Sequence, residues 1–251
     1  MSAEQPELRL AFGNAAADYE RGRADWPDAV AEVGNLPRES EVLDLAAGTG
    51  KLTRVLAGRF ARVTAVEPDE SMRALLAARV PDCHLVLEGS AEDMPVADGS
   101  VDAVFCGDAF HWFDWPVAVD EIARVLRPRG TLVLAWHYPR GDTEPAFPQA
   151  ASDVVDRYRR PGFEPGGPIY ESRVWREPFA DSPFEPLQET TIEHEFVQDR
   201  EGVVSETMSV SIFAALAAEE RTAMADELRA ALPDAVYRTP FHAEVYWTRL
   251  R

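Results

Sequence analysis

Residues 42–52 read VLDLAAGTGKL, and residues 63–68 read VTAVEP. The first stretch predicts an apolar strand that runs into a tight turn of small residues and then a helix, and the second predicts another apolar strand that ends in an acid. Such a unit binds an adenine nucleoside at the carboxyl ends of parallel strands. The two stretches therefore predict a nucleoside-binding α/β domain.

The spacing of the glycines separates three classes of ligand. Leu45 replaces the first glycine of a phosphate-binding loop and Leu52 replaces its Ser or Thr, which excludes that motif. Thr53 occupies the position of the third glycine of a dinucleotide fingerprint, which weakens that interpretation without excluding it. The pattern Asp-x-Gly/Ala-x-Gly-x-Gly is met in full, by Asp44, Ala46, Gly48 and Gly50.

This pattern resembles the class I S-adenosylmethionine-dependent methyltransferases. Three later stretches look like further motifs of that superfamily in their usual order: EGSAEDMP at 88–95, VDAVFC at 101–106 and IARVLRPRG at 122–130. Across these motifs, Ala46 and Arg129 stand where glycine is commoner in the superfamily, and Ala46 is a frequent variant there. More narrowly, DAFHWFD at 108–114 resembles the subgroup that contains trans-aconitate methyltransferase and many small-molecule methyltransferases of bacteria.

The resemblance implies that S-adenosylmethionine is the methyl donor and S-adenosylhomocysteine the product. A buried Asp44 needs a cationic or donor partner, which the ammonium of the methionine part would provide. Glu67 lies about twenty residues beyond the glycine turn, as ribose recognition requires. The residues expected to bind the cofactor are Tyr19, Arg23, Asp44, Ala46, Gly48, Gly50, Glu67, Pro68, Met72, Ser90, Ala91, Glu92, Asp108 and Ala109.

Several of these residues have competing structural roles. Met72 either covers the adenine face or belongs to the core. Ser90 either binds adenine or caps a helix. The amino-terminal segment predicts an amphipathic helix that packs Phe12 and Tyr19 inward, whereas the resemblance makes it a lid that places Tyr19 and Arg23 near the methionine carboxylate.

The methyl acceptor is expected just beyond the fourth strand, where ligands bind in such sheets. His111 there either acts as a general base or only positions the acceptor. An aromatic-rich segment follows the fifth strand, and its rings either line an apolar acceptor site or belong to the core. The expected acceptor-binding residues are His111, Trp112, Trp136 and Tyr138, and the segment adds His137, Phe147, Tyr158, Phe163, Tyr170 and Trp175.

The order of the predicted elements indicates an α/β fold with a doubly wound, mostly parallel sheet. We expect strands near 41–46, 62–67, 83–87, 101–106, 131–137, 187–197 and 241–248, and helices near 50–59, 70–79, 116–126, 147–159, 201–214 and 218–231. The resemblance makes this a Rossmann-like, seven-stranded single domain over 1–251, with an amino-terminal helical lid (8–35), a cofactor-binding core (36–137), an insertion after the fifth strand (138–186) and a sheet-closing carboxyl-terminal part (187–251).

The charge balance bears on the acceptor. The chain has 44 acidic and 25 basic residues and a net charge of -19, so a nucleic acid would meet repulsion rather than counterion-releasing contacts. We see no signal peptide and no apolar run of membrane length, which predicts a cytoplasmic protein without membrane contact. Two cysteines cannot form a structural zinc site, so no metal is expected. The oligomeric state is not predicted.

The sequence thus predicts an enzyme that moves the methyl group of S-adenosylmethionine to an oxygen, nitrogen or carbon atom of a small molecule. Two alternatives belong to other classes. A nicotinamide-dependent oxidoreductase would use the same first βαβ unit. A catalytically silent S-adenosylmethionine-binding protein would keep the fold and the donor site without turnover.

Overall fold

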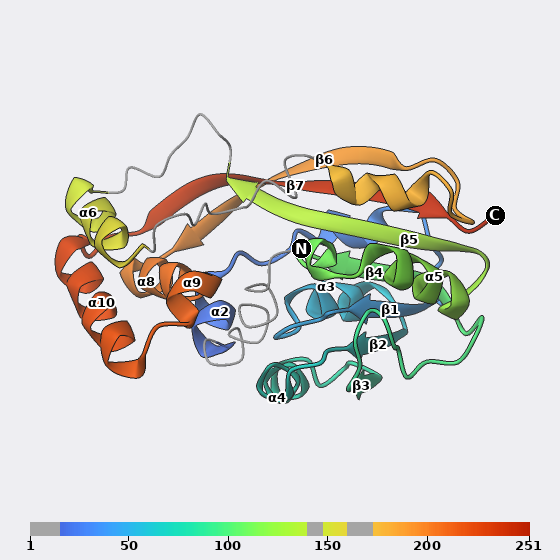
Figure 1. Cartoon of the computed structure of the whole chain (residues 1–251), viewed down its shortest axis with the longest axis horizontal. Helices are drawn as coiled ribbons and strands as arrows, with labels where there is room; N and C mark the ends of the chain where they lie inside the picture. Colours follow the sequence, from blue (N-terminus) through green and yellow to red (C-terminus); the bar gives the residue numbers. More distant parts are fainter. Residues whose placement is uncertain (1–15, 140–147, 160–172) are drawn as a thin grey trace. The chain divides into compact units, whose positions relative to one another are not determined.

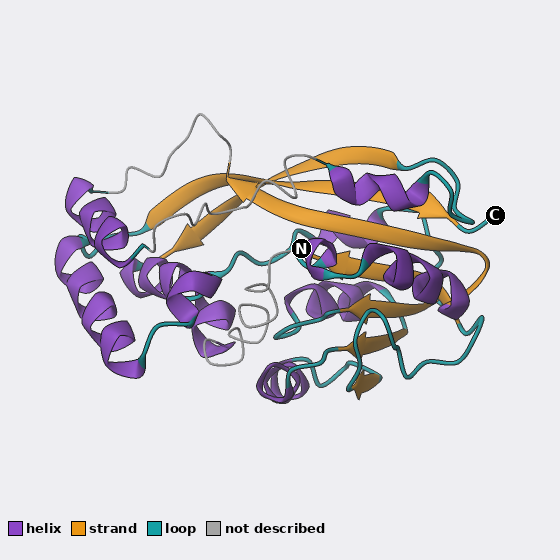
Figure 2. Cartoon of the chain, viewed as in Figure 1, coloured by secondary structure: helices purple, strands orange, loops and turns teal. Residues whose placement is uncertain are grey.

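The computed structural model describes residues 16–139, 148–159 and 173–251 of the chain (Figures 1 and 2). The chain divides into two compact units. Unit 2 contains the cofactor-binding core expected from the sequence. Unit 1 comprises Met1–Ala24, Pro139–Pro165 and His194–Phe241, and unit 2 comprises Asp25–Tyr138, Gly166–Glu193 and His242–Arg251.

Seven strands of the described residues form one sheet in the order β3-β2-β1-β4-β5-β7-β6. Strands β1 to β5 pair in parallel, whereas β7 runs opposite to its neighbours β5 and β6 (Figure 1). The prediction of a doubly wound, mostly parallel, Rossmann-like sheet is therefore confirmed. The strands are β1 (Glu41–Leu45), β2 (Arg62–Val66), β3 (Leu85–Leu87), β4 (Val101–Gly107), β5 (Leu126–Pro139), β6 (Gln188–Gln198) and β7 (Tyr237–Arg249).

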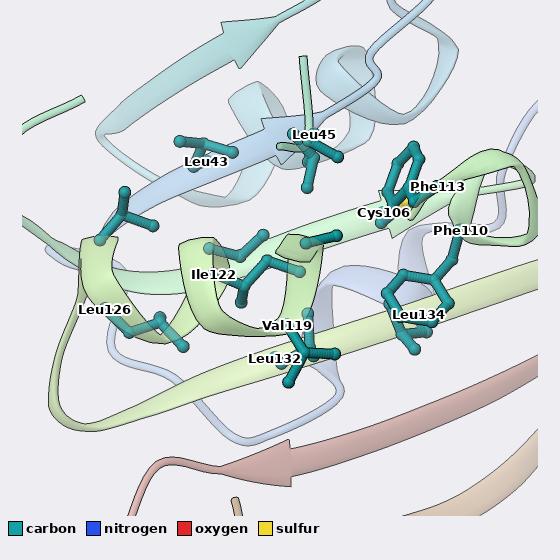
Figure 3. Close-up of a cluster of buried hydrophobic side chains, with 14 of the residues drawn as sticks. Leu43, Leu45, Cys106, Phe110, Phe113, Val119, Ile122, Leu126, Leu132 and Leu134 are labelled. Atoms are coloured by element: carbon teal, nitrogen blue, oxygen red, sulfur yellow. The ribbon is translucent and has the colours of Figure 1, made fainter. Parts of the chain in front are cut away.

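Both faces of the central strands in unit 2 are buried, which explains their nearly continuous apolar sequences. Leu43 and Leu45 join the apolar cluster under α5 (Figure 3), and Val42 joins the cluster under α3 on the opposite face. Helix α5 buries Val119 and Ile122, which lie on one face. The helices of unit 2 are η2 (Asp28–Glu32), α3 (Lys51–Arg59), α4 (Glu70–Arg79), η3 (Phe110–Trp112), α5 (Trp115–Val125) and η4 (Val174–Phe179), where η denotes a 3-10 helix.

Helices dominate the described part of unit 1. The prediction of one continuous helix over 201–214 is wrong, because the helix is interrupted between α8 (Arg200–Met208) and α9 (Ser211–Ala214). The Ser209 hydroxyl donates to the Glu206 carbonyl oxygen at 2.7 Å and Val210 is extended, with ψ of 132°, so the backbone pattern is interrupted. The helices are α2 (Ala16–Gly22), α6 (Gln149–Tyr158), α8 (Arg200–Met208), α9 (Ser211–Ala214) and α10 (Ala218–Ala231).

One predicted strand boundary in unit 2 is also wrong, and part of the predicted insertion packs in the core. Strand β5 begins at Leu126 rather than at residue 131, because residues 127–130 interrupt the register with β4 instead of separating helix from strand. The second part of the predicted insertion belongs to the core, since Trp175 and Phe184 are fully buried and join the cluster under α5. Their aromatic surface covers the sheet, which composition alone does not reveal.

Candidate cofactor and acceptor site

The carboxyl ends of β1 and β4 lie side by side where the strand order reverses, which is where ligands bind in open α/β sheets. Among the described residues, five other than glycine have positive φ, and two of them lie here. Ala46 has φ of 55° after β1, and Asp108 has φ of 52° after β4. This conformation costs an L-residue about 1–2 kcal/mol. Such strain clusters at functional sites, so the backbone itself marks this point.

Gly48 and Gly50 form the turn that leads from β1 into α3. Both have positive φ, of 58° and 90°. A Cβ at Gly50 would lie 2.8 Å from Cγ of Leu76, so packing as well as conformation requires glycine there. Apart from its chain neighbours, no described residue has an atom within 4 Å of where a Cβ at Gly48 would lie. The turn therefore leaves space beside the Gly48 backbone that the described residues do not fill.

The Glu67 carboxylate is held beside this turn. One oxygen accepts from the backbone nitrogen of Gly48 at 2.9 Å and the other from the backbone nitrogen of Asp69 at 3.0 Å. Arg73 donates to the carbonyl oxygen of Glu67 at 2.8 Å. Burial raises the pKa of Glu67 above its ordinary value. Each carboxylate oxygen can accept a further hydrogen bond, so the fixed carboxylate can bind two more donors.

Asp44, in β1, is more deeply buried than Glu67, with 1% of its surface exposed. Its Oδ2 accepts from the Thr53 hydroxyl at 2.6 Å, and in the part of the chain that the structure describes no basic side chain pairs with it. Burial raises the pKa of Asp44 to about 7. A cation beside this carboxylate would offset the cost of burying its charge. Thr53 was not predicted as the partner of Asp44. Its only signal in the sequence is its place in the predicted helix, nine residues after Asp44.

The residues expected around adenine follow β2 and β3. Pro68, also expected to bind the cofactor, comes directly after Glu67 at the end of β2. Met72 is buried at 3% exposure, and its backbone nitrogen donates to Oδ1 of Asp69 at 2.9 Å. No helix follows Ser90, so the capping alternative is wrong. Its hydroxyl instead accepts from the backbone nitrogen of Glu92 at 3.3 Å. These contacts shape a tight turn after β3, in which Ala91 is buried.

Polar and aromatic side chains meet after β4 and at the end of β5. Asp108, next to Ala109, accepts from the backbone nitrogen of His137 at 2.9 Å, and its other oxygen lies 3.2 Å from Nδ1 of the same ring. Trp26, which the sequence analysis did not single out, stacks on His137 at 3.6 Å between centroids. A lone tryptophan carries no sequence signal of such a contact. Asp108 and Trp26 therefore hold the His137 ring from two sides.

His111 lies in η3, directly beyond β4. The indole nitrogen of Trp136 donates to its Nδ1 at 3.2 Å, and the Trp112 ring lies 5.0 Å away. Burial lowers the pKa of His111 to about 4, so the ring is neutral at physiological pH. Tyr138, further along β5, packs against His242 at 5.8 Å. The structure thus brings His111, Trp112 and Trp136 together, and Tyr138 has a different neighbour.

Tyr19 and Arg23 lie in unit 1, whereas the other expected site residues lie in unit 2. Arg23 donates from Nε to the Ser209 hydroxyl at 2.8 Å, and its guanidinium lies 5.6 Å from the centre of the Tyr19 ring. A lid function for this segment stays a prediction. Outside the described residues lie Phe12, Phe147, Phe163 and Tyr170.

Known proteins resemble this chain in sequence and in fold. Residues 43–134 match a family model described as a methyltransferase domain. An uncharacterized methyltransferase of Mycobacterium tuberculosis is 37% identical over 179 residues, covering 71% of this chain and 70% of the relative. The chain belongs to the class I S-adenosylmethionine-dependent methyltransferases. A malonyl-[acyl-carrier protein] O-methyltransferase of Methylococcus capsulatus is 35% identical over 169 residues, covering 62% of this chain and 60% of the relative.

The fold of this methyltransferase agrees with that assignment. A solved structure from Anaeromyxobacter dehalogenans, described as a type II methyltransferase, matches with a TM-score of 0.63 and 26% identity over 91% of this chain and 98% of that chain. The cofactor is therefore S-adenosylmethionine, and the oxidoreductase alternative is wrong. None of these relatives is named for trans-aconitate, so that narrower resemblance stays a prediction.

The site suits this cofactor on two observations. Described residues outside the turn leave the position of a Cβ at Gly48 free, and Glu67 and Asp44 present a fixed and a deeply buried carboxylate within the same unit. When bound, the cofactor supplies a methyl group already activated by its sulfonium. The described residues contain no cluster of three or more His, Cys, Asp or Glu side chains that could hold a metal ion. Of the described helices, none has the length and apolar character needed to cross a membrane.

Proposed function

We propose that this methyltransferase transfers a methyl group to a small molecule bound beside His111. The observation that carries the donor side is the Glu67 carboxylate, which the Gly48 and Asp69 backbone hold at the point where the strand order reverses. In this arrangement Glu67 accepts from the two ribose hydroxyls, and Asp44 pairs with the ammonium of the methionine part. Binding mainly aligns donor and acceptor, an effect worth about 7–11 kcal/mol of barrier.

Met72, Ser90, Ala91 and Glu92 follow β2 and β3, and we assign them to the adenine end of the cofactor. Asp108 and Ala109 follow β4 and complete the donor site. Among the residues after β4 and on β5, His111, Trp112 and Trp136 form the acceptor side. We also assign Tyr138 to the acceptor side, because it follows Trp136 in β5.

Two observations support a small-molecule acceptor rather than a nucleic acid. The net charge of -19 repels polyanions. The relative from Methylococcus capsulatus is named for O-methylation of malonyl-[acyl-carrier protein], which supports an oxygen atom of an acyl group as acceptor rather than a nucleic acid. A mobility-shift assay at low salt checks the first point: we expect no retention of tRNA or duplex DNA, whereas tight, salt-sensitive binding would contradict the proposal.

The acceptor can be sought directly. The protein is incubated with methyl-labelled S-adenosylmethionine and a small-molecule extract of the source cells, and mass spectrometry follows the label. We expect a product that is heavier than its precursor by one labelled methyl group. At a concentration of S-adenosylmethionine that limits the reaction, the Glu67→Gln variant should not form this product. Label that enters only protein or nucleic acid in an unfractionated extract would reject a small-molecule acceptor while leaving methyl transfer intact.

A further inference from the structure

The hydrogen bond between Trp136 and His111 defines the protonation pattern of the histidine ring. An indole nitrogen always carries its hydrogen and can only donate. Because Nε1 of Trp136 donates to Nδ1 of His111 at 3.2 Å, that ring nitrogen holds a lone pair. In a neutral imidazole the hydrogen then lies on the other nitrogen, Nε2. The tautomer therefore follows from the chemistry of the partner.

The indole that sets this pattern is itself held in place. Trp136 is 2% exposed and packs against Trp175 at 4.7 Å and Tyr246 at 5.8 Å between ring centroids. The Arg176 guanidinium lies over the Trp175 and Tyr246 rings, at 5.4 and 4.6 Å from their centroids. Since these rings confine the indole on several sides, its N–H direction is fixed by the core.

Among the described residues around His111, one charged side chain, that of Asp108, influences the protonation of the ring. Asp108, on the loop after β4, favours the protonated ring, but burial outweighs this effect. Asp108 is also engaged elsewhere, because both of its carboxylate oxygens contact His137. Trp112 and Trp136, the aromatic neighbours, carry no charge. The surroundings therefore favour the neutral ring that the Trp136 hydrogen bond requires.

We propose that Trp136 is a positioning residue that fixes His111 as the Nε2–H tautomer, so that His111 presents a hydrogen-bond donor to the methyl acceptor. The inference rests on the proposed function, because it takes the acceptor to lie beside His111. A general base would need a free ring nitrogen lone pair, and the lone pair of His111 is occupied by the indole. The site thereby selects acceptors that carry a hydrogen-bond-accepting atom, and it does not remove a proton through His111.

The tautomer can be read in the full-length, ligand-free protein labelled with ¹⁵N-histidine. Long-range proton–nitrogen correlations distinguish the two neutral tautomers and the protonated ring, and His111→Gln assigns the His111 signals among the five histidines. We expect an Nε2–H ring that does not titrate between about pH 8 and pH 5, although an ordinary histidine titrates near 6.5. An Nδ1–H ring, or titration near 6.5, would overturn the proposal. This measurement on the wild type needs no variant to fold.

A matched pair of variants tests the role of Trp136. Trp136→Phe keeps a ring and removes the donor, so His111 should lose its single tautomer and its pKa should move toward the ordinary value. Trp175→Phe removes an indole from the same aromatic cluster, but the Trp175 nitrogen has no hydrogen-bond acceptor among the described residues, so the His111 signals should stay unchanged. Equal changes in both variants would show a general packing effect and reject the positioning role.

Failure of this inference and failure of the proposed donor site can be distinguished by two measurements. S-adenosylhomocysteine affinity, measured by calorimetry on the same variants, reports the donor site, and the NMR signals report the ring. A wild-type protein that binds S-adenosylhomocysteine but does not show the Nε2–H tautomer would reject this inference and leave the donor site standing. Failure of the wild type to bind the cofactor product would reject the donor site and leave the tautomer result standing.

Discussion

Replacement of Glu67 by glutamine tests the donor site most directly. The carboxylate has two acceptor oxygens, and each accepts from a backbone nitrogen, of Gly48 at 2.9 Å and of Asp69 at 3.0 Å. A glutamine amide has one acceptor oxygen and one NH₂ donor. In Glu67→Gln one backbone N–H therefore keeps its partner and the other faces a second donor.

The loss can be sized from these contacts. A hydrogen bond to a charged group contributes about 1.5–3 kcal/mol, and the variant loses at least one such bond to the ribose. The affinity for S-adenosylhomocysteine should therefore fall about 10- to 150-fold. The backbone donor left without an acceptor should lower the free energy of unfolding by about 1–3 kcal/mol. Ligand affinity and stability should thus decrease together.

The assay is calorimetric titration of S-adenosylhomocysteine at about pH 8, well above the ordinary pKa of a carboxyl group, together with urea unfolding of the ligand-free protein. Glu88→Gln is the matched control. That side chain is 76% exposed and pairs with Arg73 at 3.1 Å, so its loss should change affinity by less than about 0.5 kcal/mol. A folded Glu67→Gln protein that binds within about twofold of wild type would refute the role of Glu67.

Two further predictions follow from Asp44 and Arg129. Because the pKa of Asp44 is about 7, affinity for S-adenosylhomocysteine should rise between about pH 6 and pH 8 as the carboxylate ionises and pairs with the ligand ammonium, and Asp44→Asn should abolish this dependence in calorimetry. In the ligand-free protein the sign is opposite: the raised pKa favours folding below the ordinary 3.8, and this contribution is lost as pH rises through about 7. Arg129 is exposed with φ of 66°, so Arg129→Gly should raise the free energy of unfolding by up to about 1 kcal/mol in urea, whereas Arg129→Ala, which keeps its Cβ, should not.

The two departures from the glycine-rich pattern illustrate how far sequence reasoning extends. Ala46 and Arg129 stand where glycine is commoner, and both adopt positive φ in the structure. Positions where glycine is commoner in the family therefore have positive φ in this chain even where another residue stands there. The strain at Ala46 could not be inferred from its side chain, because the turn after β1 imposes it.

The sequence by itself determined the central elements of unit 2 and the place proposed for the donor site. The apolar runs, the glycine turn and the acid at Glu67 are local signals, since neighbouring residues set strand, turn and helix. Parallel pairing of β1 with β2 and β4 then places the ends of these strands together. Spacing along the chain was therefore sufficient to predict that the Glu67 side chain lies beside the glycine turn.

Only the tertiary structure decided the chemical state of the site. The pKa of Asp44 depends on burial and on Thr53. The tautomer of His111, in η3, depends on Trp136, which lies 25 residues away in β5. The burial of Trp175 in the core was likewise hidden by the proline-rich composition around it. Desolvation and hydrogen-bond partners come from segments that are remote in the chain, so no local pattern of residues encodes them.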